Sequence, residues 1–132
     1  MSPTKLPTRK AGMPQARSRR QIAQKYLEVA DVVAVEDGAA INVAVGLAVL
    51  AGIAAGDAIC ISATGERYSG SDHSAAAELL SRVDAKLGKR LRQLIDLKPG
   101  SHYGDRLLSA QDRSIALRAA AALVAAALER VP

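Results

Sequence analysis

The loop at positions 67–73 reads Arg-Tyr-Ser-Gly-Ser-Asp-His and carries side chains that could bind an anion and move a proton. Arg67 and His73 stand at its two ends, and Asp72 is a natural N-cap for a following helix. A guanidinium binds phosphate through two parallel hydrogen bonds, and an imidazole can act as a general acid or base near neutral pH. The pattern indicates a phosphate-binding loop, with an ordinary capped loop as the alternative.

A second polar segment brings Lys98, His102 and Tyr103 together within six residues. These three side chains could hold a phosphodiester and transfer a proton during its cleavage. The alternative is a helix terminus in which Lys98 interacts with the negative end of the helix dipole and Tyr103 closes the end of a bundle. Both interpretations stay open at the level of the sequence.

Asp57 follows a long uncharged stretch and must therefore find a partner or change its pKa if it is buried. Arg67, His73 and Lys98 are all plausible partners if they meet at the same end of the molecule, and we expect a structural ion pair. Cys60, one turn further along, is expected to be a small core residue.

Four predicted helices must position these residues. They span about residues 19–35, 39–63, 72–98 and 109–131. Apolar residues recur at a spacing of three and four, and serine or aspartate residues with capping patterns precede three of the helices. Pro99 and Gly100 are expected to end the third helix. The predicted fold is all-α, an antiparallel up-down four-helix bundle.

The second of these helices contains most of an uncharged stretch, residues 38–56, which is long enough to cross a membrane. The stretch is only weakly hydrophobic, it contains Asn42, and Asp57 ends it. Gly52 and Gly56 have the spacing of a membrane dimer motif, but small residues also let soluble helices pack closely. We expect a central helix of a cytoplasmic protein and no membrane span.

Six of the 18 Lys and Arg residues lie in the first 20 positions, where there is no acid. We expect residues 1–18 to form a disordered basic tail and residues 19–132 to form one domain. The tail could grip nucleic acid or could simply be solvated. One Cys and two His cannot supply a four-ligand zinc site, and no cofactor motif is present, so no metal and no cofactor are expected. The three aromatic residues, all Tyr, argue against base-stacking modules.

The order of these features resembles the HEPN superfamily, small all-α domains of prokaryotic defence and toxin–antitoxin systems, and in particular small proteins of the actinobacterial type. The resemblance covers about residues 20–130. It rests on positions 44–60 (AVGLAVLAGIAAGDAIC), 65–67, 70–73, 76–80, 94–98, 102–103 and a last helix capped by Ser109.

The resemblance implies a four-helix bundle that dimerises. Many members are metal-independent endoribonucleases whose Arg-x(4–6)-His motif faces its symmetry mate, and others are binding modules that have lost catalysis. Arg67 and His73 have five residues between them, which agrees with that spacing, but they precede the third helix. At the place expected for the motif, around the start of the last helix, Lys98 stands in the position of the Arg, with three residues between it and His102.

The sequence thus predicts a HEPN-like module of a toxin–antitoxin or defence-type system. It would form a homodimer and bind RNA, a nucleotide or a partner protein such as a nucleotidyltransferase or an antitoxin. One alternative is a metal-independent endoribonuclease toxin. A second alternative is a nucleic-acid-binding protein that acts through its basic tail.

Overall fold

The chain is almost entirely helical in the part that its structure describes. A computed structural model describes residues 5–103 and 107–132, and of residues 102 and 103 only the backbone. Five helices and a two-stranded ribbon follow one another along the chain. They are β1 (Thr8–Lys10), α1 (Met13–Val33), α2 (Ala39–Thr64), β2 (Glu66–Tyr68), α3 (His73–Val83), α4 (Ala85–Tyr103) and α5 (Ala110–Arg130).

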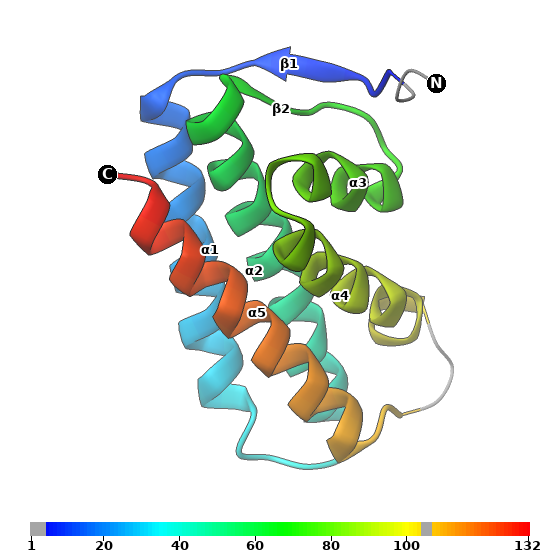
Figure 1. Ribbon diagram of the computed structural model, residues 1–132. Coiled ribbons are helices and arrows are strands. Elements are labelled where there is room, and N and C mark those ends of the chain that lie inside the picture. Colours follow the sequence, from blue (N-terminus) through cyan, green and yellow to red (C-terminus); the bar gives the residue numbers. More distant parts are fainter. Residues whose placement is uncertain (1–4, 104–106) are drawn as a thin grey trace.

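Helix α2 is the centre of the molecule and packs against all four other helices. Figure 1 shows α1, α2 and α5 side by side, with α3 and α4 covering another side of α2. The predicted bounds of α2 are confirmed, because Gly38 precedes the helix and Gly65, at φ 75°, caps its C-terminus. Left-handed backbone at this position is accessible to glycine at no steric cost.

Close packing through small side chains holds α2 against its neighbours. Helix α1 buries an alanine at every seventh position, Ala16, Ala23 and Ala30, each with no exposed surface. On α2, a Cβ added to Gly52 would come within 2.3 Å of a methyl group of Leu94, so α4 approaches the backbone of α2 directly. The small residues of α2 therefore serve contacts within one chain.

The same helix is the one candidate for a membrane span among the described residues. By length and composition α2 could cross a bilayer, and 83% of its most apolar window is buried inside the protein. A core helix that is apolar on most sides has this property. Gly52 and Gly56 face leucine side chains of the same chain, namely Leu80, Leu91, Leu94 and Leu123. Their spacing therefore gives no support to a dimer interface.

Part of the predicted basic tail belongs to the fold. The first helix begins at Met13 rather than at about residue 19. Its N-terminus is closed by Gln15, whose side-chain oxygen accepts a hydrogen bond from the Gly12 N–H at 2.9 Å. Ala16 is fully buried. Arg17 of this segment, and Arg20 one turn further along α1, donate hydrogen bonds to the carbonyls of Pro132 and Val131.

The predicted third helix is two helices, α3 and α4, because Asp84 interrupts it. Asp84 is extended (φ −154°, ψ 110°), and its carboxylate accepts hydrogen bonds from the backbone N–H groups of Lys86 and Leu87. An aspartate that satisfies free N–H groups in this way starts a new helix. The apolar spacing of residues 76–95 continues through the break, which is why the sequence pattern suggested one helix.

Pro99 does not end α4, which continues to Tyr103. Proline removes one backbone donor from a helix interior, and the carbonyls around this position find other partners. The Ser101 hydroxyl donates to the Lys98 carbonyl at 3.0 Å, and the Asn42 amide donates to the Gly100 carbonyl at 3.4 Å. The last helix begins where expected, with Ser109 and Asp112 in a reciprocal capping box.

Candidate functional site

The C-terminal end of α2 carries a buried acid that faces several cations. Asp57 is 9% exposed, and its carboxylate lies 3.1 Å from the Nη2 atom of Arg19 on α1. The Nε atom of Arg19 is buried and makes no hydrogen bond with any described residue. An ion pair at Asp57 was expected, with Arg67, His73 or Lys98 as the partner; Arg19, at the expected start of the first helix, was not among these candidates.

The charge on Asp57 is balanced by more than one neighbour. Burial raises the pKa of the Asp57 carboxyl above its usual range, and this shift is opposed by the nearby charges of Arg19, Arg67 and His73. The expected proximity of Arg67 and His73 to Asp57, at the same end of the molecule, is confirmed. Lys98, the third partner considered there, is not among these charges.

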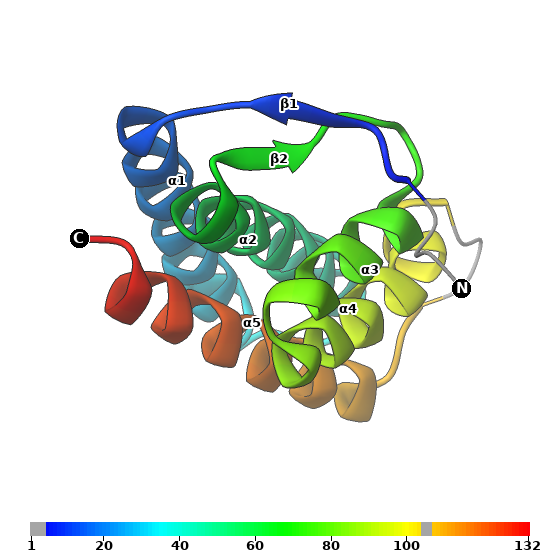
Figure 2. The same ribbon diagram turned by 45° about the horizontal axis from the view of Figure 1, so that its top comes forward.

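A two-stranded ribbon places Arg67 over this acid. Figure 2 shows β1 and β2 lying across the ends of α1 and α2. The strands are antiparallel, with Arg9 opposite Arg67. Directly opposed residues of such a pair share a face, and two like charges there are unfavourable unless an anion lies between or near them. The ribbon therefore brings the charge of Arg67 into the surroundings of the Asp57 carboxylate.

The loop between the ribbon and α3 is held by Tyr68. Its hydroxyl accepts a hydrogen bond from the Asp72 N–H at 3.0 Å, and its ring lies so close to Gly70 that an added Cβ would come within 2.2 Å of the hydroxyl oxygen. Asp72 caps α3 as predicted, accepting from the Ser74 N–H at 3.0 Å. This arrangement fixes His73 at the first position of α3.

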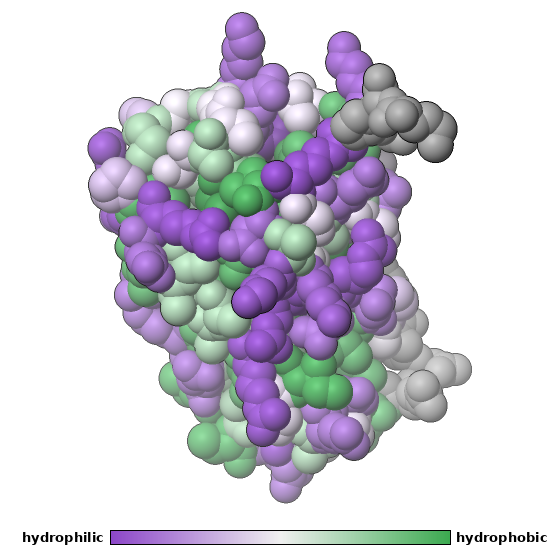
Figure 3. Space-filling model, in the orientation of Figure 1, coloured by the Kyte–Doolittle hydropathy of each residue, from purple (hydrophilic) through white to green (hydrophobic). Residues whose placement is uncertain are grey.

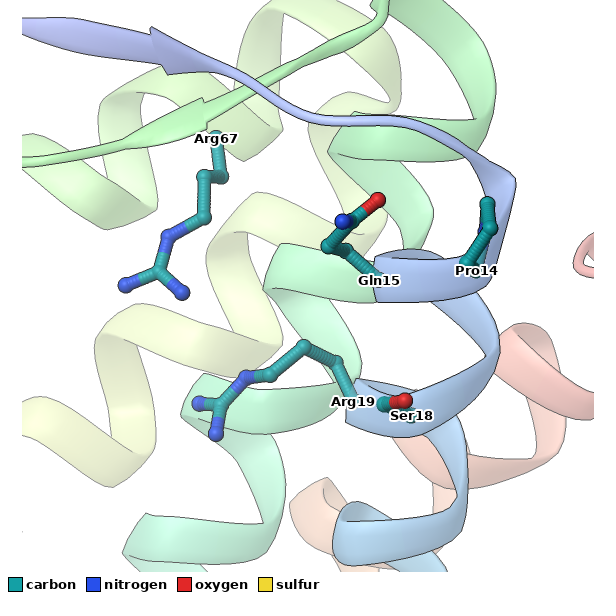
Figure 4. A pocket seen from close by; sticks show the side chains of 5 residues that line it. All are labelled: Pro14, Gln15, Ser18, Arg19 and Arg67. Atoms are coloured by element: carbon teal, nitrogen blue, oxygen red, sulfur yellow. The ribbon is translucent and has the colours of Figure 1, made fainter.

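A pocket of about 220 Å³ opens beside Arg19 and Arg67. Figure 4 shows that both guanidinium groups point to the same side of α1, one from the helix and one from the ribbon. The pocket is lined by Pro14, Gln15, Ser18, Arg19 and Arg67. Two guanidinium groups at a pocket wall, of which one is paired with an acid, form a site suited to an anion.

The other predicted cluster lies at the opposite end of α2. Lys98 is half-buried on α4, two residues before Gly100, whose carbonyl accepts from Asn42 near the start of α2. Asn42 and Asp57 are separated by about 22 Å along the helix, from the rise of 1.5 Å per residue. The side chains of His102 and Tyr103 lie outside the described part of the chain. The two clusters are thus separate sites.

Cys60 is a core residue, as predicted. It is 3% exposed, and burial together with the charge of Asp57 raises the pKa of its thiol to about 12. A thiol in this state is a poor nucleophile and a poor metal ligand. Among the described residues, no group of three or more His, Cys, Asp or Glu side chains is placed to hold a metal ion.

Comparison of the chain with protein-family models and with curated proteins found no match. The assignment of a function therefore rests on the residues and their geometry.

Proposed function

We propose that the protein is a small binding module for a phosphate-bearing ligand, a nucleotide or a segment of RNA, held in the pocket between α1 and β2. The observation that carries the proposal is the pair of guanidinium groups on that pocket, from Arg19 and Arg67, which stand 48 positions apart in the sequence but line one hollow. No short-range sequence pattern brings these two arginines together, and two like charges do not stabilise each other.

The charges around the pocket support an anionic ligand. Asp57 is the buried acid of this region, and it already pairs with Arg19. Arg67 and the opposing Arg9 therefore stand with excess positive charge, and the buried Nε of Arg19 has no hydrogen-bond acceptor among the described residues. A phosphate accepts hydrogen bonds from an arginine fork in bidentate fashion and would neutralise this excess charge.

The wider setting of this proposal comes from the resemblance to HEPN proteins. Helices α1, α2, α4 and α5 would be the four helices of an antiparallel up-down bundle, with α3 as a separate short helix. The module would act as a homodimer in the cytoplasm, within a toxin–antitoxin or defence-type system, beside a nucleotidyltransferase or an antitoxin. Support comes from the all-helical architecture and the Arg67–His73 spacing.

The test is titration of the protein with AMP and with a short single-stranded RNA, followed by calorimetry and fluorescence anisotropy. Arg67→Ala should weaken binding of both ligands at least tenfold, since the loss of a charge-assisted hydrogen bond costs about 1.5–3 kcal/mol. Arg67→Lys should restore only part of it, because lysine lacks the planar fork. Arg118→Ala, which removes an exposed arginine on α5, is the matched control and should bind normally. Unchanged affinity in Arg67→Ala would refute the pocket.

A second candidate function, cleavage of RNA, is favoured by one observation. His73, Arg67 and Asp57 interact electrostatically at the same end of α2. In such a reaction the 2′-hydroxyl attacks the adjacent phosphorus, its proton passes to a base, and the 5′-oxygen leaves with a proton. His73 would transfer a proton, and Arg67 would stabilise the negative charge that develops on the phosphorane.

This activity should persist in EDTA and leave 2′,3′-cyclic phosphate ends. His73→Ala should then slow cleavage by about 10²–10⁴-fold. Lys98→Ala and His102→Ala are the comparison, because they test the cluster at the other end of α2. Binding of RNA without cleavage under all these conditions would leave the module as a binding protein.

A further inference from the structure

Helix α4 presents a row of cations to solvent, away from the Asp57 pocket. Lys86, Lys89 and Arg90 are exposed, and with Gln93 they line a hollow of about 320 Å³. Their positions differ by three, four and seven residues, which places them on one face of the helix. Figure 3 shows hydrophilic side chains over much of the surface in front of α4. We call Lys86, Lys89, Arg90 and Gln93 the α4 basic face.

The charge of the α4 basic face is not neutralised within the chain. Residues 85–93 contain four Lys and Arg residues and no acid. Asp84, the nearest acid in sequence, is engaged elsewhere: it caps α4 and forms an ion pair with Arg130 of α5. None of the ion pairs between described residues involves Lys86, Lys89 or Arg90.

This arrangement has a cost in the isolated protein. The first turn of α4 contains Lys86 and no acid, although the positive end of a helix dipole disfavours cations there. The face is also firmly held, because Gly88 packs so closely on Ser81 of α3 that an added Cβ would lie 1.8 Å from the Ser81 hydroxyl oxygen. Although the Asp84 carboxylate caps the helix, this rigid row of cations forms no ion pair among the described residues, which makes it suited to an external anion.

We propose that the α4 basic face binds the phosphate backbone of a nucleic acid strand, at a surface separate from the Asp57 pocket. Lys86 and Arg90 are about 6 Å apart along the helix axis, and three successive phosphates on one strand of a duplex span about 7 Å of its axis. Three cations thus match about three successive phosphates. Contacts of this kind fix position without reading sequence.

The composition of the face favours a nucleic acid over a protein or a lipid surface. Among the described residues, the large apolar side chains that are exposed come from other elements. They are Ile22, Val29, Val32, Val35, Val43, Leu107, Ile115 and Leu128. Protein interfaces and membrane-bound helices rely on apolar anchors, which this face of α4 does not offer. A polyphosphate backbone needs only the cations.

The experiment measures binding of a short labelled single-stranded RNA, and of DNA with the same sequence, between about 50 and 200 mM KCl. The double variant Lys86→Ala/Lys89→Ala should bind both strands roughly 25-fold more weakly at 0.1 M salt, since each phosphate contact contributes about 0.7 to the slope of log K against log salt concentration. The slope itself should become shallower by about 1.4. AMP, which offers one phosphate to the pocket, should bind this variant normally.

The matched control is Lys25→Ala/Arg118→Ala, which removes the same charge from exposed positions on α1 and α5. It should keep most of the affinity and the salt slope, and Lys86→Arg/Lys89→Arg should keep both as well. Thermal melting checks the fold, and loss of Lys86 should not lower the melting temperature because its charge opposes the helix dipole. Equal losses in the two alanine variants, or competition by polyglutamate as effective per charge as RNA, would overturn the proposal.

Binding of AMP and its loss in Arg67→Ala report on the pocket, whereas the difference in strand affinity and salt slope between the two double alanine variants reports on α4, so the two proposals can fail independently.

Discussion

The two ends of α2 satisfy a polar side chain in opposite ways, with a buried acid at one end and a half-buried amide at the other. At the C-terminal end, the carboxylate of Asp57 meets the charges of Arg19, Arg67 and His73, and a pocket opens beside them. At the N-terminal end, the amide of Asn42 meets backbone groups: it donates to the Gly100 carbonyl and accepts from the Leu108 N–H at 2.9 Å. One end concentrates charge, and the other satisfies neutral groups.

This difference teaches how to separate a functional cluster from a structural one. A neutral amide that bridges two backbone groups has a structural role, because buried N–H and C=O groups need hydrogen-bond partners. Stability alone does not account for a buried acid with several cations around it and an unpaired guanidinium nitrogen. Replacing such a group by apolar residues often leaves the free energy of unfolding unchanged. The sequence offered polar clusters near both ends, and among the described residues the cations that surround a buried acid lie at the Asp57 end.

The largest effect should follow removal of the acid. Asp57→Ala leaves Arg19 three-quarters buried with no partner, and loss of one member of a buried pair should lower the free energy of unfolding by about 3 kcal/mol. Asp57→Asn keeps an oxygen for Arg19 and should lose less. Urea unfolding followed by circular dichroism measures both. A loss under about 1 kcal/mol for Asp57→Ala would mean that Arg19 finds solvent easily.

The other end of α2 should be more tolerant. Asn42→Ala deprives one N–H and one carbonyl of their partner and should lower the free energy of unfolding by about 1–2 kcal/mol. Val43→Ala, at a half-exposed position in the same turn, is the control and should change stability little. The same urea experiment applies, and an effect of Asn42→Ala that exceeds that of Asp57→Ala would reverse the comparison of the two ends.

The pH dependence of stability should carry a signature of the buried acid. Since the pKa of Asp57 is raised in the folded protein, the native state holds this proton at a pH where the unfolded chain has released it. The free energy of unfolding contributed by Asp57 therefore falls as pH rises from about 4, the pKa of an unfolded Asp, through the folded-state pKa. Comparing wild type with Asp57→Asn from acid to neutral pH isolates this contribution. If the free energy of unfolding of wild type rose with pH relative to that of Asp57→Asn, this prediction would be wrong.

Asp84 should give the smallest effect and the opposite sign. Its hydrogen bonds, first from Arg130 and then from the Leu87 N–H, lower the pKa of this carboxyl. The stability that it contributes is present above about pH 4 and is lost as pH falls through the folded-state pKa. Comparison of Asp84→Asn with wild type by acid unfolding should show this. An acid-side difference of the same sign as that of Asp57 would rule out the capping role.

Local signals in the sequence predicted several elements correctly. The uncharged run between Gly38 and Gly65 is α2, Asp72 caps α3, and Ser109 with Asp112 caps α5. In each case the residues that interact lie within a few positions of one another, so the local sequence pattern is enough to predict the local structure. Arg67 and His73 were likewise placed near Asp57, because all three follow one another around the end of α2.

Other expectations failed where distant groups compete with local ones. The apolar spacing of residues 76–95 concealed the break at Asp84, whose carboxylate also reaches Arg130 on α5. The basic segment before Ser18 reads as disordered by composition, yet its backbone extends the ribbon and α1. Arg19 was missed as a site residue because its partner, Asp57, lies 38 positions away in the sequence. A signal was available in the alanine that recurs at positions 16, 23 and 30.

By itself, the sequence determined that the protein is helical, where α2 lies, and which residues could do chemistry. Periodicity and capping are set by neighbours three or four positions away, and these are written in the chain. Only the tertiary structure decided that Arg19 and Arg67 share one pocket, that Lys98 lies at the far end of α2, and that Lys86, Lys89 and Arg90 remain without acids. Which charges pair depends on how α2 brings remote helices together through close contacts of small residues, and no local pattern encodes that.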